Sequence, residues 1–317
     1  MSDDNSENIL PLLPGPYQLI EQVGAGGLGR VFKAQVKDTH EIVAIKILHD
    51  EMLKRPEILG SFHKELLILS QMKHKNIVSY IEAKWDPPIC YVVTDFIEGW
   101  NGYKLLKEVK NFPPLVALCV LVQVLQAVDH LHVHDIIHSD LTPGNILINK
   151  QGRAFLTDFG LSLVSDVDSS EGKKFGTPGY FSPEHIRRKA LTEASDLYEA
   201  GLLLYQLISG KRLLPNSKDT RMVIAAMKKR DLSQIGMPKG GLEKAILAVI
   251  KKSVSYYRLF RYTNAEDMIH DISVILKASG ISYPRLAVWQ FLSDQNLSDK
   301  DFTGKRQPIY GKNHKPA

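Results

Sequence analysis

The chain has 317 residues, of which 44% are hydrophobic, and this composition excludes wholesale disorder. Its 40 Lys and Arg against 35 Asp and Glu give a net charge of +5, too weak and too scattered to indicate nucleic-acid binding. The two cysteines, Cys90 and Cys119, have no metal-binding spacing, so we expect buried, inert thiols in a reducing compartment.

Two stretches bear on targeting. Residues 1–15 are acidic and polar before a short Leu/Pro run, which does not match a secretory signal. The longest apolar stretch, residues 115–128, is shorter than the ~20 residues that a membrane span needs, and it contains Gln123 and Gln126. We therefore expect a buried helix there, no membrane span, and a soluble, cytoplasmic protein.

Residues 17–94 have the pattern of a small β-rich unit. Short apolar and β-branched runs separated by glycine or polar turns predict strands. These runs span residues 17–23, 30–36, 41–48, 77–81 and 90–96. Between them, apolar residues at 3/4 spacing predict one helix over residues 56–72.

After Gly99 the pattern changes to helix. The predicted helices span residues 115–132, 197–208, 222–229, 242–253 and 265–277. The layout is α+β: a flexible tail (1–16), a β-rich N-lobe (17–94), a hinge (95–100), a larger helical C-lobe (101–280) and a C-terminal extension (281–317). Within the extension, residues 285–302 form either a short amphipathic segment packed on the lobe or a partner-docking tail.

A glycine-rich loop lies between the first two predicted strands, and it reads Gly24, Ala25, Gly26, Gly27, Leu28, Gly29. Glycines let backbone N–H groups approach phosphate oxygens without an intervening Cβ. A dinucleotide-binding loop would open a helix, whereas a strand follows here. A glycine-rich hairpin without function is the alternative.

Lys46 is a single lysine in an otherwise apolar strand. A buried lysine is costly unless an anion accompanies it. Glu65, on the apolar-facing side of the following helix, is the candidate partner, and bound phosphates would be a second one. The alternatives are an edge lysine that reaches water and a solvated Glu65.

The stretch from His138 to Gly160 carries three polar residues suited to phosphoryl transfer. Asp140 and Asn145 lie on one loop, and Asp158 follows a short hairpin. Together they can orient or deprotonate a hydroxyl and hold Mg²⁺ on a nucleotide triphosphate.

In this order and spacing the motifs resemble the eukaryotic-like protein kinase superfamily over residues 17–279. The glycine loop is similar to the form common in bacterial serine/threonine kinases. Further motifs support the resemblance: Gly176-Thr177-Pro178, Ser182-Pro183-Glu184, Asp196 and Arg261. The resemblance implies a bilobal protein-kinase-like fold and an ATP-dependent protein serine/threonine kinase. For a bacterial effector, the location would be the host cytosol.

The resemblance also implies roles for particular residues. Asp140 would accept or orient the proton of the substrate hydroxyl, Lys46 would bind the α- and β-phosphates, and Asn145 and Asp158 would bind Mg²⁺. The residues implied to contact ATP are Val23, Gly24, Ala25, Gly26, Gly27, Leu28, Gly29, Val31, Ala44, Lys46, Glu65, Thr94, Asp95, Ile97 and Leu147.

Other residues are implied to be scaffold. Glu184 would pair with Arg261, and Asp196 would brace the catalytic loop backbone. Thr94 falls at the gatekeeper position. A hydrophobic spine linking the lobes would consist of Leu69, Tyr80, His138 and Phe159.

Two residues depart from the family pattern. Ser139 replaces the arginine that meets a phosphorylated activation loop, so we expect activity that does not depend on phosphorylation of Ser165, Ser169 or Ser170. Thr142 replaces a lysine that neutralises charge on the transferring phosphoryl group, so we expect slower turnover.

Alternative functions follow from the same departures. A pseudokinase or nucleotide-binding regulatory module would use the fold without transfer, and a kinase-like enzyme could phosphorylate a small molecule. Asn101 and Gly144 occupy positions where arginine-directed kinases have acidic residues, so a strong preference for basic substrates is not expected. Glu98 and Asp95 are the acidic residues that could still contribute to one. The expected partners are ATP and a protein substrate, without nucleic acid.

Overall fold

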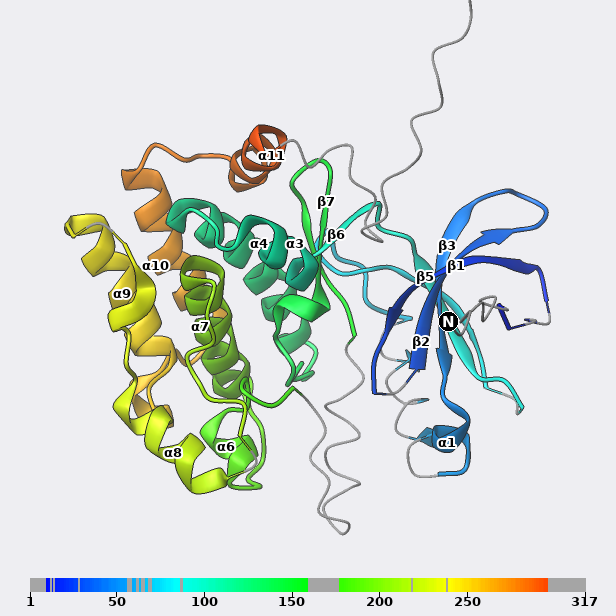
Figure 1. Ribbon diagram of the computed structural model, residues 1–317, viewed down its shortest axis with the longest axis horizontal. Coiled ribbons are helices and arrows are strands. Elements are labelled where there is room, and N and C mark those ends of the chain that lie inside the picture. Colours follow the sequence, from blue (N-terminus) through cyan, green and yellow to red (C-terminus); the bar gives the residue numbers. More distant parts are fainter. Residues whose placement is uncertain are drawn as a thin grey trace, which may run out of the picture.

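The computed structural model describes residues 10–11, 13, 15–27, 29–55, 59–60, 63, 66–67, 70–85, 88–158, 177–217, 219–237 and 239–295. They form a β-rich N-terminal lobe and a larger helical C-terminal lobe (Figure 1). This arrangement confirms the predicted bilobal α+β fold.

An antiparallel five-stranded sheet forms the N-terminal lobe. In spatial order its strands are β1 (Tyr17–Ala25), β2 (Gly29–Val36), β3 (Ile42–Leu48), β5 (Tyr91–Asp95) and β4 (Tyr80–Lys84), and the short helix α1 (Asp50–Leu53) follows β3. Phe32, Ile45 and Val93 come from neighbouring strands and are at most 1% exposed. The alternation of apolar residues therefore produces one buried face, as expected for a half-buried sheet.

The strand predicted over residues 77–81 begins later, at Tyr80. Ile77 instead forms a parallel bridge with Leu156, and the Val78 N–H donates to the Leu156 carbonyl oxygen at 3.1 Å. In return the Leu156 N–H donates to the Asn76 carbonyl oxygen at 2.8 Å. The first part of the apolar run thus pairs with the C-terminal lobe and joins the two lobes.

The helix predicted over residues 56–72 is described in part. Residues 59, 60, 63, 66 and 67 are helical, and Leu66 is buried against Leu48, Cys90 and Val92. Ile58, Phe62, Glu65 and Leu69 lie outside the described residues.

The C-terminal lobe combines a small antiparallel sheet with a set of helices. The sheet consists of β6 (Gly99–Asn101), β7 (Ile146–Asn149) and β8 (Ala154–Leu156). The helices are α3 (Gly102–Val109), α4 (Pro114–His132), α6 (Pro183–Ile186), α7 (Glu193–Ser209), α8 (Thr220–Lys229), α9 (Gly241–Ser253), α10 (Ala265–Ala278) and α11 (Pro284–Asp294). The predicted hairpin before Asp158 is the β7–β8 pair, and α3 was not predicted.

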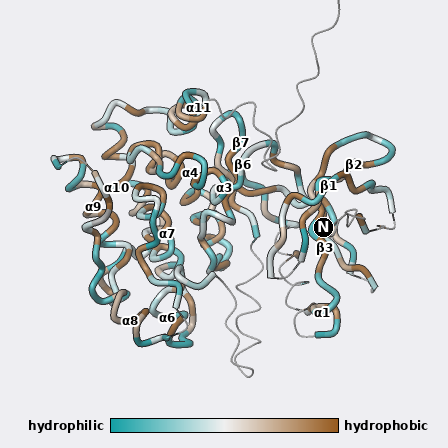
Figure 2. The backbone as a smooth tube through the Cα atoms, viewed as in Figure 1, coloured by the Kyte–Doolittle hydropathy of each residue, from teal (hydrophilic) through white to brown (hydrophobic). Residues whose placement is uncertain are grey.

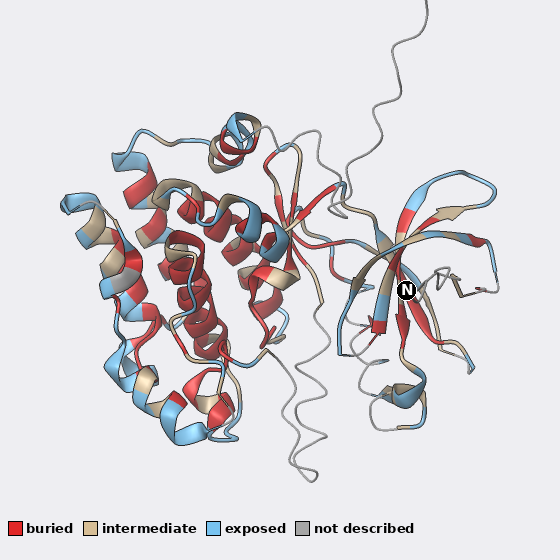
Figure 3. Ribbon diagram, viewed as in Figure 1, coloured by how far each residue is buried: buried red, intermediate tan, exposed pale blue. Residues whose placement is uncertain are grey.

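Helices α4 and α7 form the centre of the lobe. Figure 3 shows that both helices are largely buried. Figure 2 shows hydrophobic residues along both helices, whereas the β2–β3 turn of the other lobe is hydrophilic. Within the described part of the chain, α4 is the one helix long and apolar enough to cross a membrane. It packs against α7, α10 and α11, as expected of a buried core helix.

The C-terminal extension contributes α11 to this core. Val288, Phe291 and Leu292 are buried, and the Phe291 ring centroid lies 5.3 Å from that of Phe112. Of the two readings for residues 285–302, packing on the lobe is therefore confirmed as far as residue 295. Residues 296–302 lie outside the described part.

A buried ion pair joins α6 to the segment before α10. Arg261 donates through its two terminal nitrogens to the two carboxylate oxygens of Glu184, at 2.8 and 3.0 Å. It also donates to the carbonyl oxygens of Ala194, Ser255 and Tyr256. The pair that the resemblance implied is therefore present, and because the Arg261 side chain is fully buried, its further bonds fix three segments of the lobe.

Replacing Arg261 by Met should lower the free energy of unfolding by about 3–5 kcal/mol, because Glu184 would keep a mostly buried charge without its partner. Urea unfolding followed by circular dichroism measures the change. Arg258→Met is the control, because Arg258 is exposed on the adjacent turn, and it should change stability by less than about 0.5 kcal/mol. Equal stabilities of the two variants would contradict this role for Arg261.

Candidate active site

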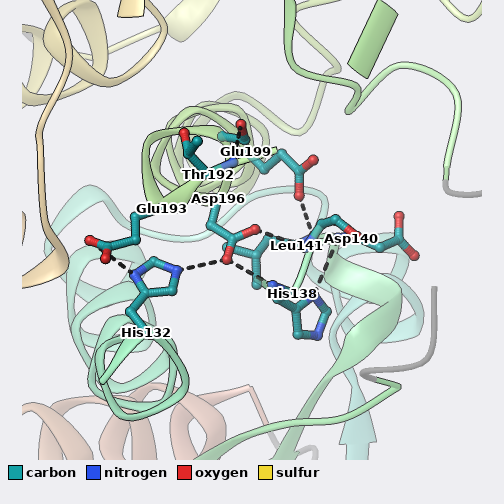
Figure 4. A network of polar contacts seen from close by, with 10 residues as sticks. His132, His138, Asp140, Leu141, Thr192, Glu193, Asp196 and Glu199 are labelled. Carbon is teal, nitrogen blue, oxygen red and sulfur yellow. Dashed lines mark hydrogen bonds and ion pairs between the residues drawn. The ribbon is translucent and has the colours of Figure 1, made fainter. Parts of the chain in front are cut away.

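Asp196 on α7 holds the start of the loop that contains Asp140. Its Oδ2 accepts from the His138 N–H at 2.9 Å, and its Oδ1 accepts from the Ser139 N–H at 2.8 Å (Figure 4). The His132 ring on α4 lies 2.8 Å from the same Oδ2. The predicted bracing of the loop by Asp196 is thus present, and it lets Ser139 hold a left-handed backbone at φ 60°.

Asp140 and Asn145, which the motif places on one loop, are in direct contact. The Asn145 side-chain amide donates to Asp140 Oδ2 at 2.7 Å and to the Asp140 carbonyl oxygen at 2.9 Å. The other carboxylate oxygen, Oδ1, accepts from the Thr177 N–H at 3.0 Å. Both oxygens of Asp140 are therefore fixed, and the orientation of the Asn145 amide leaves its Oδ1 as the atom suited to a cation.

Lys46 of the N-terminal lobe contacts Asp158 of the C-terminal lobe through a hydrogen-bonded ion pair. Burial alone would raise the pKa of Asp158, but the Lys46 ammonium and, more weakly, His138 lower that pKa below its ordinary value. The predicted partner Glu65 lies outside the described residues. Strand β3 is paired on both sides, so the alternative of an edge lysine is wrong.

Asp158 has a left-handed backbone with φ 60°. Aspartate tolerates this conformation better than most residues, yet it still costs free energy. The residue adopts this conformation two positions after the end of β8, where its side chain contacts Lys46. Phe159 and Gly160, which follow in the motif, lie outside the described residues.

The glycine loop is a tight turn in which the Gly26 N–H donates to the Gly29 carbonyl oxygen at 2.9 Å. Gly29 is required by packing, because an added Cβ would lie 2.2 Å from the Ile47 carbonyl oxygen. Gly26 and Gly27 differ: a Cβ on either would meet no described atom within 4 Å, and neither has positive φ. Packing does not explain these two glycines, whereas backbone approach to a phosphate group does. Leu28 lies outside the described residues.

The other residues implied to contact ATP lie on strands β1, β2, β3, β5 and β7, except Ile97, which follows β5. The sheet register sets Ala44 opposite Thr94 and Val31 opposite Lys46. The half-buried members of this set are Val23, Gly24, Val31, Ala44, Thr94, Ile97 and Leu147, whereas Ala25 and Asp95 are exposed. Apolar side chains left half-covered are suited to a flat ligand ring.

The polar groups present fit a magnesium–triphosphate group. The described residues contain no cluster of three His, Cys, Asp or Glu side chains that could enclose a metal ion. Mg²⁺ needs no such cluster, because one or two protein oxygens are usually completed by phosphates and water. Asp158 and Asn145 supply that kind of donor, and Lys46 supplies a cation for phosphate.

One residue of the network was missed in the sequence. Glu199 Oε2 accepts from the Leu141 N–H at 2.9 Å, so α7 contacts the loop through a second carboxyl group (Figure 4). The available signal was a glutamate three residues after Asp196, on the same face of an apolar helix.

Substitution by alanine should affect stability differently at Gly29, where an added Cβ would clash, and at Gly26, where it would meet open space. Gly29→Ala should destabilise the N-terminal lobe by roughly 1–3 kcal/mol, because the new methyl group overlaps the β3 backbone. Gly26→Ala, the matched control, should alter stability by less than about 0.5 kcal/mol. Thermal unfolding of both variants measures this, and equal melting temperatures would refute the distinction.

Comparisons with known proteins show the family of this chain. A sequence model described as the protein kinase domain matches residues 17–271. A probable serine/threonine-protein kinase of Clostridium perfringens is 28% identical over 94% of this chain and 42% of that protein. The serine/threonine-protein kinase PrkC of Bacillus subtilis is 28% identical over 87% of this chain and 43% of that protein.

The kinase domain of Mycobacterium tuberculosis PknI has the same fold, with a TM-score of 0.66 at 17% identity over 82% of this chain and 96% of that chain. The chain spans less than half the length of the two curated relatives. Since the family model covers residues 17–271, well over half of the sequence, the chain belongs to the protein kinase domain family.

Proposed function

We propose that the chain is an ATP-dependent protein serine/threonine kinase that transfers the γ-phosphate of Mg²⁺-ATP to Ser or Thr hydroxyl groups. The observations that carry this proposal are two side-chain pairs, Lys46 with Asp158 and Asn145 with Asp140, which a backbone hydrogen bond from the Thr157 N–H to the Asn145 carbonyl oxygen brings next to each other. The names of the bacterial relatives support the same substrate class.

Each of these residues has one task in the proposed reaction. Asp140, whose two oxygens are fixed by Asn145 and Thr177, accepts a hydrogen bond from the substrate hydroxyl and orients it towards the γ-phosphate. Lys46 binds the α- and β-phosphates. Asn145 and Asp158 hold Mg²⁺, which would neutralise charge on the phosphates. On this account, catalysis comes from positioning the reactants and neutralising the charge on the phosphates, without a covalent intermediate on the protein.

The two departures from the family pattern are compatible with this function, but they bear on how the enzyme is regulated and how fast it turns over. Ser139 and Thr142 are buried, with 3% and 4% of their surface exposed. Neither carries a charge, so Ser139 offers a phosphorylated loop no cationic receptor, and Thr142 offers the transferring phosphoryl group at most a neutral hydrogen bond. We infer slow turnover and no requirement for loop phosphorylation.

The positions of Asn101 and Gly144 support the absence of a strong preference for basic substrates. The Asn101 side-chain amide donates to the Gly144 carbonyl oxygen, and the Asn101 oxygen caps α3 through the Tyr103 and Lys104 N–H groups. Both positions are thus occupied by neutral groups bonded to each other. A basic substrate side chain would find no carboxylate from either residue.

Asp140→Asn should reduce phosphate transfer by about 10²–10⁴-fold while ATP still binds, because the general base is lost and the phosphate ligands remain. Transfer of radiolabelled phosphate from Mg²⁺-ATP to a generic protein substrate measures the rate, and ATP-induced thermal shift measures binding. Asp135→Asn is the control, because Asp135 is exposed and also has positive φ, which asparagine tolerates. ATP binding without transfer in the wild type would instead indicate a pseudokinase.

The combined substitution of Ser165, Ser169 and Ser170 by Ala should leave the transfer rate nearly unchanged, because Ser139 provides no cation for a phosphorylated loop. The same assay tests this, beside wild-type protein treated with a phosphatase. Loss of activity in both preparations would show that loop phosphorylation is required. These three serines lie outside the described residues.

A further inference from the structure

Glu199 is a carboxyl group buried in the centre of the C-terminal lobe. Glu199 is 1% exposed, and its Oε2 lies 2.9 Å from the backbone nitrogen of Leu141. Leu141 is itself fully buried and directly follows Asp140. Figure 4 shows Glu199 reaching from α7 to the loop beside Asp140.

The hydrogen bonds of the loop explain why this contact matters. The N–H groups of His138 and Ser139 donate to Asp196, and the Asp140 N–H donates to the His138 ring at 3.3 Å. The remaining donor, the Leu141 N–H, donates to Glu199. Asp196 and Glu199 lie three residues apart on α7, so one helix face holds the loop on both sides of Asp140.

Without Glu199, the Leu141 N–H would lose the acceptor that its buried position requires. A buried unpaired donor is costly, so the loop would shift to pair it. A small displacement of a catalytic group is enough to slow a reaction strongly. Asp140 would be displaced first, because it is bonded through one peptide unit to the affected N–H.

We propose that Glu199 is a positioning residue for phosphoryl transfer: its carboxyl group anchors the Leu141 N–H and thereby fixes the direction of the Asp140 carboxylate. This inference rests on the proposed kinase function. Glu199 does not touch substrate, and it acts through the loop backbone.

The surroundings of Glu199 favour its neutral form. The charged and titratable groups that face this region are Asp196 on α7, Asp140 on the loop, and His132 on α4, which is bonded to Asp196. Burial and the Asp196 carboxylate raise the pKa of Glu199 well above its ordinary value, and the Leu141 hydrogen bond opposes this only in part. A neutral carboxyl group still has a carbonyl oxygen that accepts a hydrogen bond. Glutamine has the same shape and the same acceptor, so it should replace Glu199.

The test compares Glu199→Gln with Glu199→Leu, which keeps a similar volume and has no acceptor. Glu199→Gln should keep kcat within about twofold of wild type, whereas Glu199→Leu should lower kcat roughly tenfold with an unchanged KM for ATP. Gln206→Leu is the control, a buried polar residue about two turns along the same helix, and it should leave kcat unchanged. Thermal unfolding of all variants separates a lower kcat from partial unfolding.

Hydrogen exchange of the Leu141 amide gives a readout that does not depend on activity. The amide should be protected in the wild type and in Glu199→Gln, and it should exchange faster in Glu199→Leu. Unchanged kcat and exchange in Glu199→Leu would overturn the proposal, as would an equal loss of kcat in Glu199→Gln. If the wild type binds Mg²⁺-ATP but transfers no phosphate, the proposed function fails, and the exchange rates still decide whether Glu199 holds the loop.

Discussion

The conformation of the Asp140 loop depends on acceptors for four consecutive backbone N–H groups. The residues that carry them, His138 to Leu141, are at most 4% exposed, so water cannot satisfy these donors. Asp196, the His138 ring and Glu199 take that place. Helix α7 is rigid because its apolar residues are buried against α4 and α9, so its two carboxyl groups define where Asp140 can lie.

The second constraint is the link between the lobes. Lys46 reaches Asp158 across the lobes, and residues 76–78 exchange backbone hydrogen bonds with Leu156 of β8. Asp158 follows the same strand, so the bridge to the N-terminal lobe and the ion pair lie at one end of the β7–β8 hairpin. The position of Asp158 relative to Lys46 is therefore set by a backbone connection as well as by charge.

The sequence was sufficient wherever a pattern is local. Strands β1 to β3 follow from short apolar and β-branched runs between glycine or polar turns, and α4 and α7 from long apolar runs, because burial selects those patterns directly. The shift of β4 could not be foreseen, since the partner of Ile77 is Leu156, far along the chain. Helix α3 was missed because its apolar face is short. Its buried residues are Leu105, Leu106 and Gly102.

The candidate site shows the same division. The motif placed Asp140 and Asn145 on one loop and gave each a role, and the structure adds the hydrogen bond between them. Glu199 carries no motif, and its role depends on a backbone group 58 residues away. Glu199 can be identified only when it is known which N–H groups of the loop find no acceptor within the loop itself. That is a property of the folded chain.

The two uncharged residues Ser139 and Thr142 and the raised pKa of Glu199 concern the same local excess of negative charge. Ser139 and Thr142 bring no positive charge to a region that already contains Asp140 and Asp196. An ionised Glu199 would add a third buried negative charge beside them, and the low dielectric of the core would make that repulsion large. The raised pKa of Glu199 disfavours that charge, and the hydrogen bond to the Leu141 N–H needs only an acceptor oxygen, which either form of the carboxyl group has. A carboxyl group can therefore hold the loop without requiring a third negative charge beside Asp140 and Asp196.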